Sequence, residues 1–209
     1  MAQAFGTINS STIVPVVGTI VLPVDGDFAW INQETATVTA ENNGITLTTP
    51  ASAGHDIRLR KKAAPATPYT ITALIHPLMG EHASGNAWGI GFRQSSDGKL
   101  ALVYVGDSSG SVVVAVQKFT DPNTFSATYV IKTIVPATGV IYPFTSLWLR
   151  IADDGVNRIS SLSWDGIQFY TLHSVGRTDF LTADEIGFFV NSATASAGVT
   201  ISLYSWRQT

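Results

Sequence analysis

The chain has 209 residues, of which 45% are hydrophobic and 13% are charged, and it contains no cysteine. This composition excludes a disordered tail, and the lack of cysteine excludes disulfides, thiolate zinc sites and cysteine nucleophiles. The formal net charge of -3 argues against binding to nucleic-acid backbones. We therefore expect one domain that buries a hydrophobic core without covalent cross-links.

The chain shows no sign of a membrane or secretion segment. No uninterrupted apolar run approaches the roughly 20 residues that cross a membrane. No Lys or Arg precedes Arg58, so the basic start of a signal peptide is missing. We expect no membrane span, no nucleic-acid partner and no cofactor, and, if the protein is cellular, synthesis in the cytoplasm.

Residues 1–24 contain no charged side chain and are rich in Ile, Val, Thr, Ser and Gly. Prolines and glycines divide this segment into short extended pieces rather than a helix. Because solvated tails are usually charged, two interpretations remain open. The segment is either the first strand of the domain or an arm that docks on another subunit or a larger assembly. We place the N-terminal arm at residues 1–24 and the folded domain at residues 25–209.

Short alternating or β-branched runs follow the arm. They predict strands at residues 28–31, 35–40, 45–49, 69–76, 87–93, 99–105, 112–118 and 125–134. Asn43-Gly44 and Asp97-Gly98 are strong turn signals between such runs. The small residues beside Trp88 predict a strand with one face that is either crowded by a neighbour or open to a ligand.

One further strand carries an unusual row of positive charges. Ile57 and Leu59 alternate with Arg58, Arg60 and Lys62, which places the cations on one side. The pattern is typical of a solvated or edge strand, on which charge discourages pairing with another sheet. An anion-binding or acidic-glycan patch is the alternative.

Residues 146–173 predict an antiparallel meander of three strands. Leu147, Leu149 and Ile151 fall on one face, and Trp148 and Arg150 fall on the other. Tight turns are expected at the two Asp-Gly pairs, 154–155 and 165–166, and the third strand begins at residue 167. Half-buried strands of this kind need a second apolar layer to cover them, so we predict an all-β, two-sheet antiparallel jelly-roll sandwich.

The C-terminal part is predicted to contain one helical turn and two strands. Residues 178–184 resemble a single turn of helix with Thr178 or Asp179 at its start. Strands are expected at residues 186–190 and 199–206.

The sequence offers no convincing catalytic or metal site. Residues 106–110, G-D-S-S-G, fit the G-x-S-x-G nucleophile motif literally, but a strand follows them instead of a helix, so we interpret them as a hairpin loop. The four histidines are dispersed, without the spacing of a helical zinc site. Asp153 and Asp154 could bind calcium, although their turn role explains both. We predict no catalytic residues and no metal ligands.

Aromatic side chains are the remaining candidates for binding. Sugar rings stack on exposed indole faces, while Asp, Asn and Arg bind their hydroxyls. The alternative for each tryptophan is a place in the core, because large rings dominate sandwich cores. We predict a glycan-binding surface that consists of Trp88, Arg93, Trp148, Arg150, Trp164 and Asp165.

The order of several motifs resembles a known family. These motifs are P-Y-T-I-T-A-L-I, G-I-G-F-R, W-L-R-I-A-D-D-G, S-W-D-G-I-Q-F-Y and I-S-L-Y-S-W. Together they resemble the concanavalin A-like lectin/glucanase sandwich, in particular the laminin G-like modules of tailed-phage virion proteins, over about residues 25–209. The resemblance implies two antiparallel sheets, one of them concave, with glycans bound on the concave face or its rim.

The resemblance does not by itself imply activity. Glucanases of this superfamily carry Glu, Asp and Glu on alternate residues of one strand, with the acid and nucleophile about 5 Å apart. No Glu of this chain has a second carboxylate two residues away, and Asp25 and Asp27 flank a turn glycine. Glycoside hydrolysis therefore remains only as an alternative.

We expect a non-enzymatic phage virion protein, such as a capsid decoration, fibre or spike component. Its expected partners are other virion proteins or further copies of itself, contacted through the N-terminal arm, and surface glycans. This hypothesis implies a homo-oligomer that is located in the virion, with an arm that docks the protein on the particle or trimerises it. A lectin module that stands alone is the second alternative.

Overall fold

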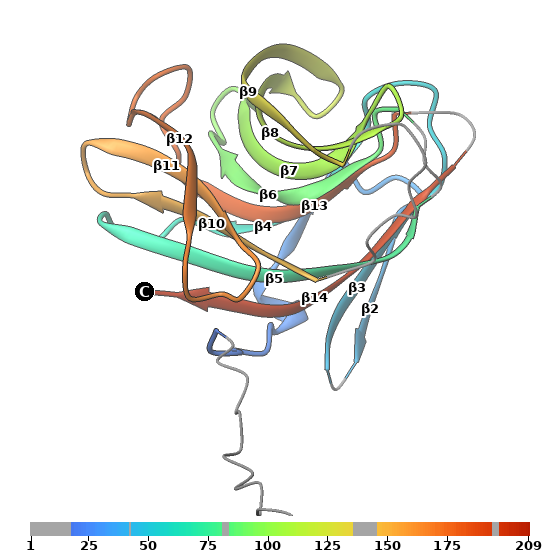
Figure 1. Ribbon diagram of the computed structural model, residues 1–209, viewed down its shortest axis with the longest axis horizontal. Helices are drawn as coiled ribbons and strands as arrows, with labels where there is room; N and C mark the ends of the chain where they lie inside the picture. The colour runs from blue at the N-terminus through green and yellow to red at the C-terminus, as the bar shows by residue number, and fades with distance from the viewer. Residues whose placement is uncertain (1–17, 42, 81–83, 136–145, 194–196) are drawn as a thin grey trace, which may run out of the picture.

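The computed structural model describes residues 18–41, 43–80, 84–135, 146–193 and 197–209. In these ranges the chain forms two seven-stranded sheets that pack face to face, and neighbouring strands within each sheet run antiparallel (Figure 1). This arrangement confirms the predicted all-β, two-sheet sandwich. No helix long and apolar enough to cross a membrane occurs in the described part of the chain.

Each sheet is defined by its strand order. Sheet A consists, from edge to edge, of β1 (Ala29–Ile31), β4 (Ile57–Ala63), β13 (Glu185–Asn191), β6 (Ala87–Arg93), β7 (Leu100–Ser108), β8 (Ser111–Asp121) and β9 (Thr124–Val135). Sheet B consists of β12 (Tyr170–Gly176), β11 (Asn157–Ser163), β10 (Leu147–Asp153), β5 (Tyr69–Gly80), β14 (Val199–Gln208), β3 (Gly44–Thr49) and β2 (Thr37–Glu41). A short 3-10 turn, η1 (Asp25–Asp27), precedes β1.

The last two strands of the chain lie inside the sheets and not at their edges. β13 pairs with β4 and β6 in sheet A, and β14 pairs with β5 and β3 in sheet B. Both sheets are therefore continuous only when residues near the C-terminus are in place.

The main core lies between the sheets and follows the expected period of two. Leu147, Leu149 and Ile151 of β10 are at most 3% exposed and pack in this core, which confirms their predicted face. The meander is also confirmed, because β10 pairs with β11 and β11 pairs with β12. Gly155 and Gly166 have positive φ, as the two Asp-Gly turns require.

Two local predictions are wrong. Residues 167–169 are not strand, and β12 begins only at Tyr170, because Asp165 Oδ1 accepts the backbone N–H groups of Ile167 and Gln168 and extends the turn. Residues 178–184 form no helical turn. Phe180 has a φ of 65°, in the left-handed region that interrupts a right-handed helix.

The positively charged strand is not an edge and is not solvated. β4 lies between β1 and β13, and Arg58 and Arg60 are 2% and 5% exposed. Their side chains point toward the segment that contains η1 and β1. Arg58 pairs with Glu34 and Asp56, and Arg60 pairs with Asp25. These ion pairs attach residues 25–34 to sheet A, so the alternative of a free anion patch on β4 is also wrong.

Residues 18–24 of the expected arm contact β14 of sheet B and the turn after β11. Val21 O accepts the Trp206 N–H at 2.8 Å, and Val21 N donates to Ser205 Oγ at 2.9 Å. Gly18 N donates to Asp165 O at 2.8 Å. This part of the arm is thus held on its own domain, while residues 1–17 lie outside the described residues.

Replacing Arg58 with Ala should lower the free energy of unfolding by about 3–5 kcal/mol, because the variant leaves the Asp56 carboxylate buried without its partner. The matched control is Lys62→Ala on the same strand, whose partner Asp27 is half exposed. An exposed pair of that kind contributes at most about 1 kcal/mol. Chemical denaturation measures both, and equal losses in the two variants would contradict the role assigned to the buried pair.

Candidate functional site

Sheet A is strongly curved, and its concave face is apolar. β6, β7, β8 and β9 form a deep curve whose open side faces away from sheet B (Figure 1). A second cluster of buried side chains lies apart from the main core and is formed by Ile57, Leu59, Ala87, Leu100, Leu102, Tyr104, Val113, Ala115, Phe119 and Phe189. These residues alternate along their strands with residues of the main core, so they occupy the face that sheet B does not cover.

A cavity of about 150 Å³ opens on this concave face. Its described lining comes from six strands and the loops beside them, namely His55, Ile57, Ser84, Gly85, Ala87, Leu102, Tyr104, Asp107, Ser108, Gln117, Phe119, Ile131, Phe189 and Asn191. Apolar side chains form the floor, and polar groups lie around it. This is the usual composition of a small-molecule site.

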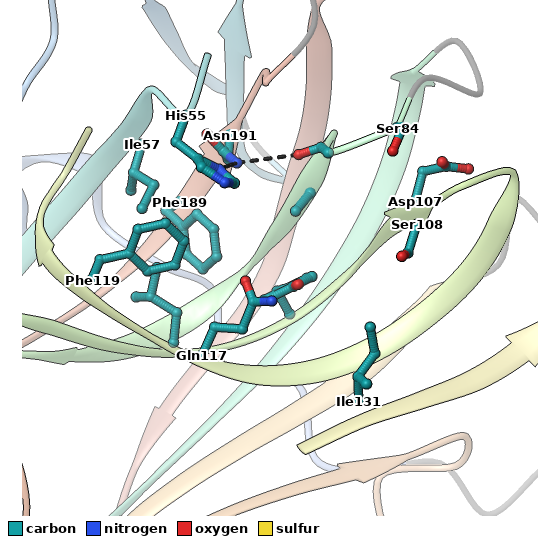
Figure 2. A pocket seen from close by; sticks show the side chains of 14 residues that line it. His55, Ile57, Ser84, Asp107, Ser108, Gln117, Phe119, Ile131, Phe189 and Asn191 are labelled. Atoms are coloured by element: carbon teal, nitrogen blue, oxygen red, sulfur yellow. Dashed lines mark hydrogen bonds between the residues drawn. The ribbon is translucent and has the colours of Figure 1, made fainter. Parts of the chain in front are cut away.

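The polar groups gather at two ends of the cavity. Figure 2 shows His55 and Asn191 near Phe119 and Phe189 at one end, and Ser84, Asp107 and Ser108 at the other. Gln117 lies between the two groups, and Ile131 of β9 lies at the side. A ligand that spans the cavity can therefore meet hydrogen-bonding groups at both ends and apolar carbon between them.

Hydrogen bonds fix the first end. Asn191 Oδ1 accepts the Asp56 N–H at 2.8 Å, which turns the amide so that Nδ2 donates to Gly85 O and to His55 Nδ1, both at 3.2 Å. Since His55 Nδ1 is an acceptor, the proton of the neutral imidazole is on Nε2. The ring also packs edge-on to Phe119 and stacks on Phe125. Burial lowers the pKa of His55, which agrees with a neutral ring.

The second end is the hairpin between β7 and β8. Asp107 Oδ1 accepts the Gly110 N–H at 3.1 Å, and Ser109 and Gly110 both have positive φ, as a tight hairpin requires. The hairpin interpretation of residues 106–110 is thus confirmed. Asp107 O also accepts the Gly85 N–H at 3.0 Å, which connects this turn to the loop before β6.

The chemistry available in the described lining is that of hydrogen bonding. Asp107 supplies a carboxylate, and Ser84, Ser108, Gln117 and Tyr104 supply hydroxyl and amide groups. Burial raises the pKa of Tyr104 to about 12, so its phenol stays protonated at physiological pH. Within the described ranges, no three His, Asp or Glu side chains come together as a metal site.

The structure separates the six residues of the predicted glycan surface. Trp88 is 8% exposed and packs in the core between the sheets, and Trp148 is 4% exposed. Trp148 is buried because Gly166 packs directly on its ring, so that a Cβ added to Gly166 would lie 2.6 Å from Trp148 Cε2. The expectation of exposed indole faces is therefore wrong for these two residues.

The other four residues lie on two different sheets and on the turn after β11. Arg93 is on the concave face of sheet A but is paired with Glu185, which also accepts from Lys61. Arg150 is on the outer face of sheet B under the ring of Phe169. Trp164 is 60% exposed, and the adjacent Asp165 caps its own turn. Glycan binding by these four residues stays a prediction.

The sequence contained one signal for the cavity. Ala87, Gly89 and Gly91 were expected to leave one face of their strand crowded or open, and both outcomes occur. Ala87 lines the cavity, whereas a Cβ added to Gly89 would lie 2.1 Å from Val103 O. The other lining residues come from distant strands, and no local pattern marked them.

Acidification should destabilise the protein partly through His55. Its pKa in the folded state is below the ordinary value of 6.5, so the unfolded chain takes up a proton that the folded pocket resists. The unfolding free energy should therefore fall as the pH drops through and below 6.5.

The variant His55→Phe keeps the ring between Phe119 and Phe125 but cannot titrate. Denaturation at pH 7 and pH 5 should show a smaller pH dependence for this variant than for the parent chain. His173, whose pKa is also lowered by burial, contributes the same dependence to both proteins and serves as the internal reference. An unchanged pH dependence would contradict the assignment.

Comparisons with known proteins place the fold. No family model matches the sequence, and no curated protein matches it. Among solved structures, the carbohydrate binding module CBM66 from Bacillus subtilis is similar at a TM-score of 0.53 and 14% identity, covering 87% of this chain and 94% of that one. Lectin I-B4 from Griffonia simplicifolia is similar at a TM-score of 0.55 and 11% identity, covering 89% and 94%.

A third similar structure belongs to a larger protein. The GH43 BlXynB protein from Bacillus licheniformis has a TM-score of 0.63 and 14% identity, with 87% of this chain matching 36% of that one. At these identities the likeness concerns the fold. Together with the two seven-stranded sheets, it shows that the chain has the concanavalin A-like sandwich fold.

Proposed function

We propose that the protein is a non-enzymatic glycan-binding protein that holds one sugar ring in the concave cavity of sheet A. The observation that carries this proposal is the cavity itself, with its apolar floor between two polar ends. The similar structures include a carbohydrate binding module and a lectin, which supports the same class of ligand.

The size of the cavity suits a single ring. A closed apolar cavity of about 150 Å³ can hold a six-membered ring such as benzene, and the concave cavity has about this volume. A pyranose has the same ring size, with C–H groups on its faces and hydroxyls around its edge. Leu102 and Phe189 can pack against a face, while hydroxyls reach Asp107 and Gln117.

The donor and acceptor set favours binding over hydrolysis. Hydrolysis by the usual two-carboxyl mechanism needs an acid and a second carboxylate close to the scissile bond. In the described lining the carboxylate is Asp107, which accepts the Gly110 N–H. A single carboxylate among amides and hydroxyls is sufficient to orient a neutral sugar.

Replacing Asp107 with Asn should weaken glycan binding at least about tenfold, because a charged hydrogen bond contributes about 1.5–3 kcal/mol. The new amide keeps an oxygen for the Gly110 N–H, so the hairpin is retained. A glycan array selects the ligand, and calorimetry with the parent chain and the variant measures the affinity. An assay for released reducing sugar tests hydrolysis in the same samples.

Trp164→Ala is the matched control, because Trp164 is exposed on sheet B and was the sequence-based candidate. We expect it to bind like the parent chain. Loss of binding in Trp164→Ala with full binding in Asp107→Asn would move the site to sheet B. Release of reducing sugar that Asp107→Asn abolishes would instead establish a hydrolase.

A second role, docking to a virion through the N-terminal arm, is also proposed. The supporting observation is a run of exposed apolar side chains on the described part of the arm, since Ile20, Leu22 and Val24 are 47%, 55% and 62% exposed. An uncharged segment that shows such side chains suits contact with another protein. Exposed apolar side chains of this kind suit both self-association of the arm and docking on other virion proteins.

Deleting residues 1–17 should lower the mass in solution to that of the monomer and leave the melting temperature unchanged. Deleting residues 1–24 should also lower the melting temperature, because the bonds from Val21 to Ser205 and Trp206 are lost. Light scattering and thermal unfolding measure the two effects. If the parent chain is already a monomer, the arm does not mediate self-association. If the protein is absent from purified particles, the proposed virion role is wrong.

A further inference from the structure

A row of paired residues on the outer face of sheet B brings two arginines together. Thr72 of β5 is the register partner of Arg150 on β10 and of Arg207 on β14. Residues directly opposite each other in an antiparallel pair send their side chains to the same face. Since Ile151 and Trp206, the chain neighbours of the two arginines, point into the core, Arg150 and Arg207 lie on the outer face on either side of Thr72.

In the described part of the chain these two arginines, like Arg158, form no ion pair with a carboxylate. Arg158, however, donates to the backbone oxygen of Asp179. Of the seven arginines in the chain, Arg58, Arg60, Arg93 and Arg177 form ion pairs with carboxylates. In the described part of the chain no carboxylate lies within ion-pair distance of Arg150 or Arg207, although both are half-buried.

Neutral contacts fix the position of the Arg150 guanidinium. Its Nε donates to Thr72 Oγ1 at 3.1 Å, and its central carbon lies 3.3 Å from the centroid of the Phe169 ring. The Thr72 hydroxyl thus occupies Nε, and the Phe169 ring covers one face of the guanidinium. The planar fork is held in place while its terminal N–H groups have no carboxylate to bind.

The two cations repel each other at this position. Burial lowers the pKa of the Arg150 guanidinium, and the nearby positive charge of Arg207 lowers it further. Two half-buried like charges side by side are unfavourable unless an anion lies between them. The fold therefore holds a site whose charge is complementary to something outside the described chain.

We propose that Arg150 and Arg207 bind an oxyanion group on the outer face of sheet B. Guanidinium groups recognise carboxylate, sulfate and phosphate oxygens through two parallel hydrogen bonds, and a pair of them selects these groups over chloride. The group can be the carboxylate of an acidic sugar or a free inorganic anion. This site lies on the sheet opposite the concave cavity and does not depend on the cavity binding a sugar.

The test uses the full chain with sodium glucuronate, sodium sulfate and sodium phosphate, each compared with sodium chloride at equal ionic strength. NMR follows the Nε–Hε resonances of the arginines, and thermal unfolding follows stability. We expect saturable shifts at Arg150 and Arg207 and a higher melting temperature with at least one anion. A response to glucuronate alone identifies a carboxylate ligand, and a response to sulfate or phosphate identifies the inorganic group.

Arg207→Met is the decisive variant, because Arg207 makes no ion pair with any described residue whose loss would disturb the fold. It should weaken anion binding at least about tenfold, the effect of one charge-assisted hydrogen bond. Without anion it should be as stable as the parent chain or more stable, since the repulsion is relieved. If Arg207 only stabilised the fold, Arg207→Met without anion would be less stable than the parent chain.

Lys132→Met on β9 of sheet A removes one exposed positive charge and is the matched control. It should leave the anion response unchanged. The proposal is overturned if none of the three anions produces a saturable shift, if Arg207→Met responds as the parent chain does, or if Lys132→Met loses the response equally. Arg150→Lys, which keeps the charge but not the fork, should weaken binding and provides a second check on the geometry.

Discussion

The curvature of sheet A depends on a close approach of neighbouring backbones that only glycine permits. Gly91 of β6 is the register partner of Gly187 of β13, and a Cβ added to Gly187 would lie 2.3 Å from Arg60 O. A Cβ added to Gly89 would likewise lie too close to Val103 O, at 2.1 Å. Because no side chain projects from the concave face at these positions, the neighbouring backbones can come this close on that face. The cavity is thus a consequence of missing side chains as much as of the residues that line it.

The same residue type has opposite roles on the two sheets. Arg58 and Arg60 are deeply buried but neutralised, because the chain before and after β1 supplies carboxylates for them. Their contribution is to attach that segment. Arg150 and Arg207 are less buried, and neither forms an ion pair in the part of the chain that the structure describes. Arg150 instead contacts the Thr72 hydroxyl and the Phe169 ring. Burial alone therefore does not separate a structural arginine from a binding one, whereas the charge balance around it does.

The alternation of apolar and polar residues and the turn residues predicted most of the fold. These signals failed where contacts between residues distant in sequence determine the local structure or the burial of a side chain. The predicted inner and outer faces of β10 were correct, because the alternation of residues along a single strand determines which side chains share a face. Trp148 lies on its expected face, yet it is buried because Gly18 and Gly166, one of them 130 residues away in sequence, pack beside each other over it. The cavity could not be predicted from the sequence, since Asn191 and Asp107 are far apart in the chain and the motif that contains Asp107 predicts only a hairpin loop. Among the small residues beside Trp88 that the sequence analysis noted, Ala87 lies in the cavity lining.

The positions of β13 and β14 have a consequence for the synthesis of the protein. Each is an internal strand of its sheet, and each follows in chain order the strands with which it pairs. Until residue 185 has emerged, β4 and β6 have no common neighbour, and β5 and β3 have none until β14 follows. The nascent chain must therefore hold long apolar strands with unpaired edges, a state that is prone to aggregation. Neither sheet is continuous before residues 185–208 have been synthesised, so folding during translation cannot complete either sheet earlier.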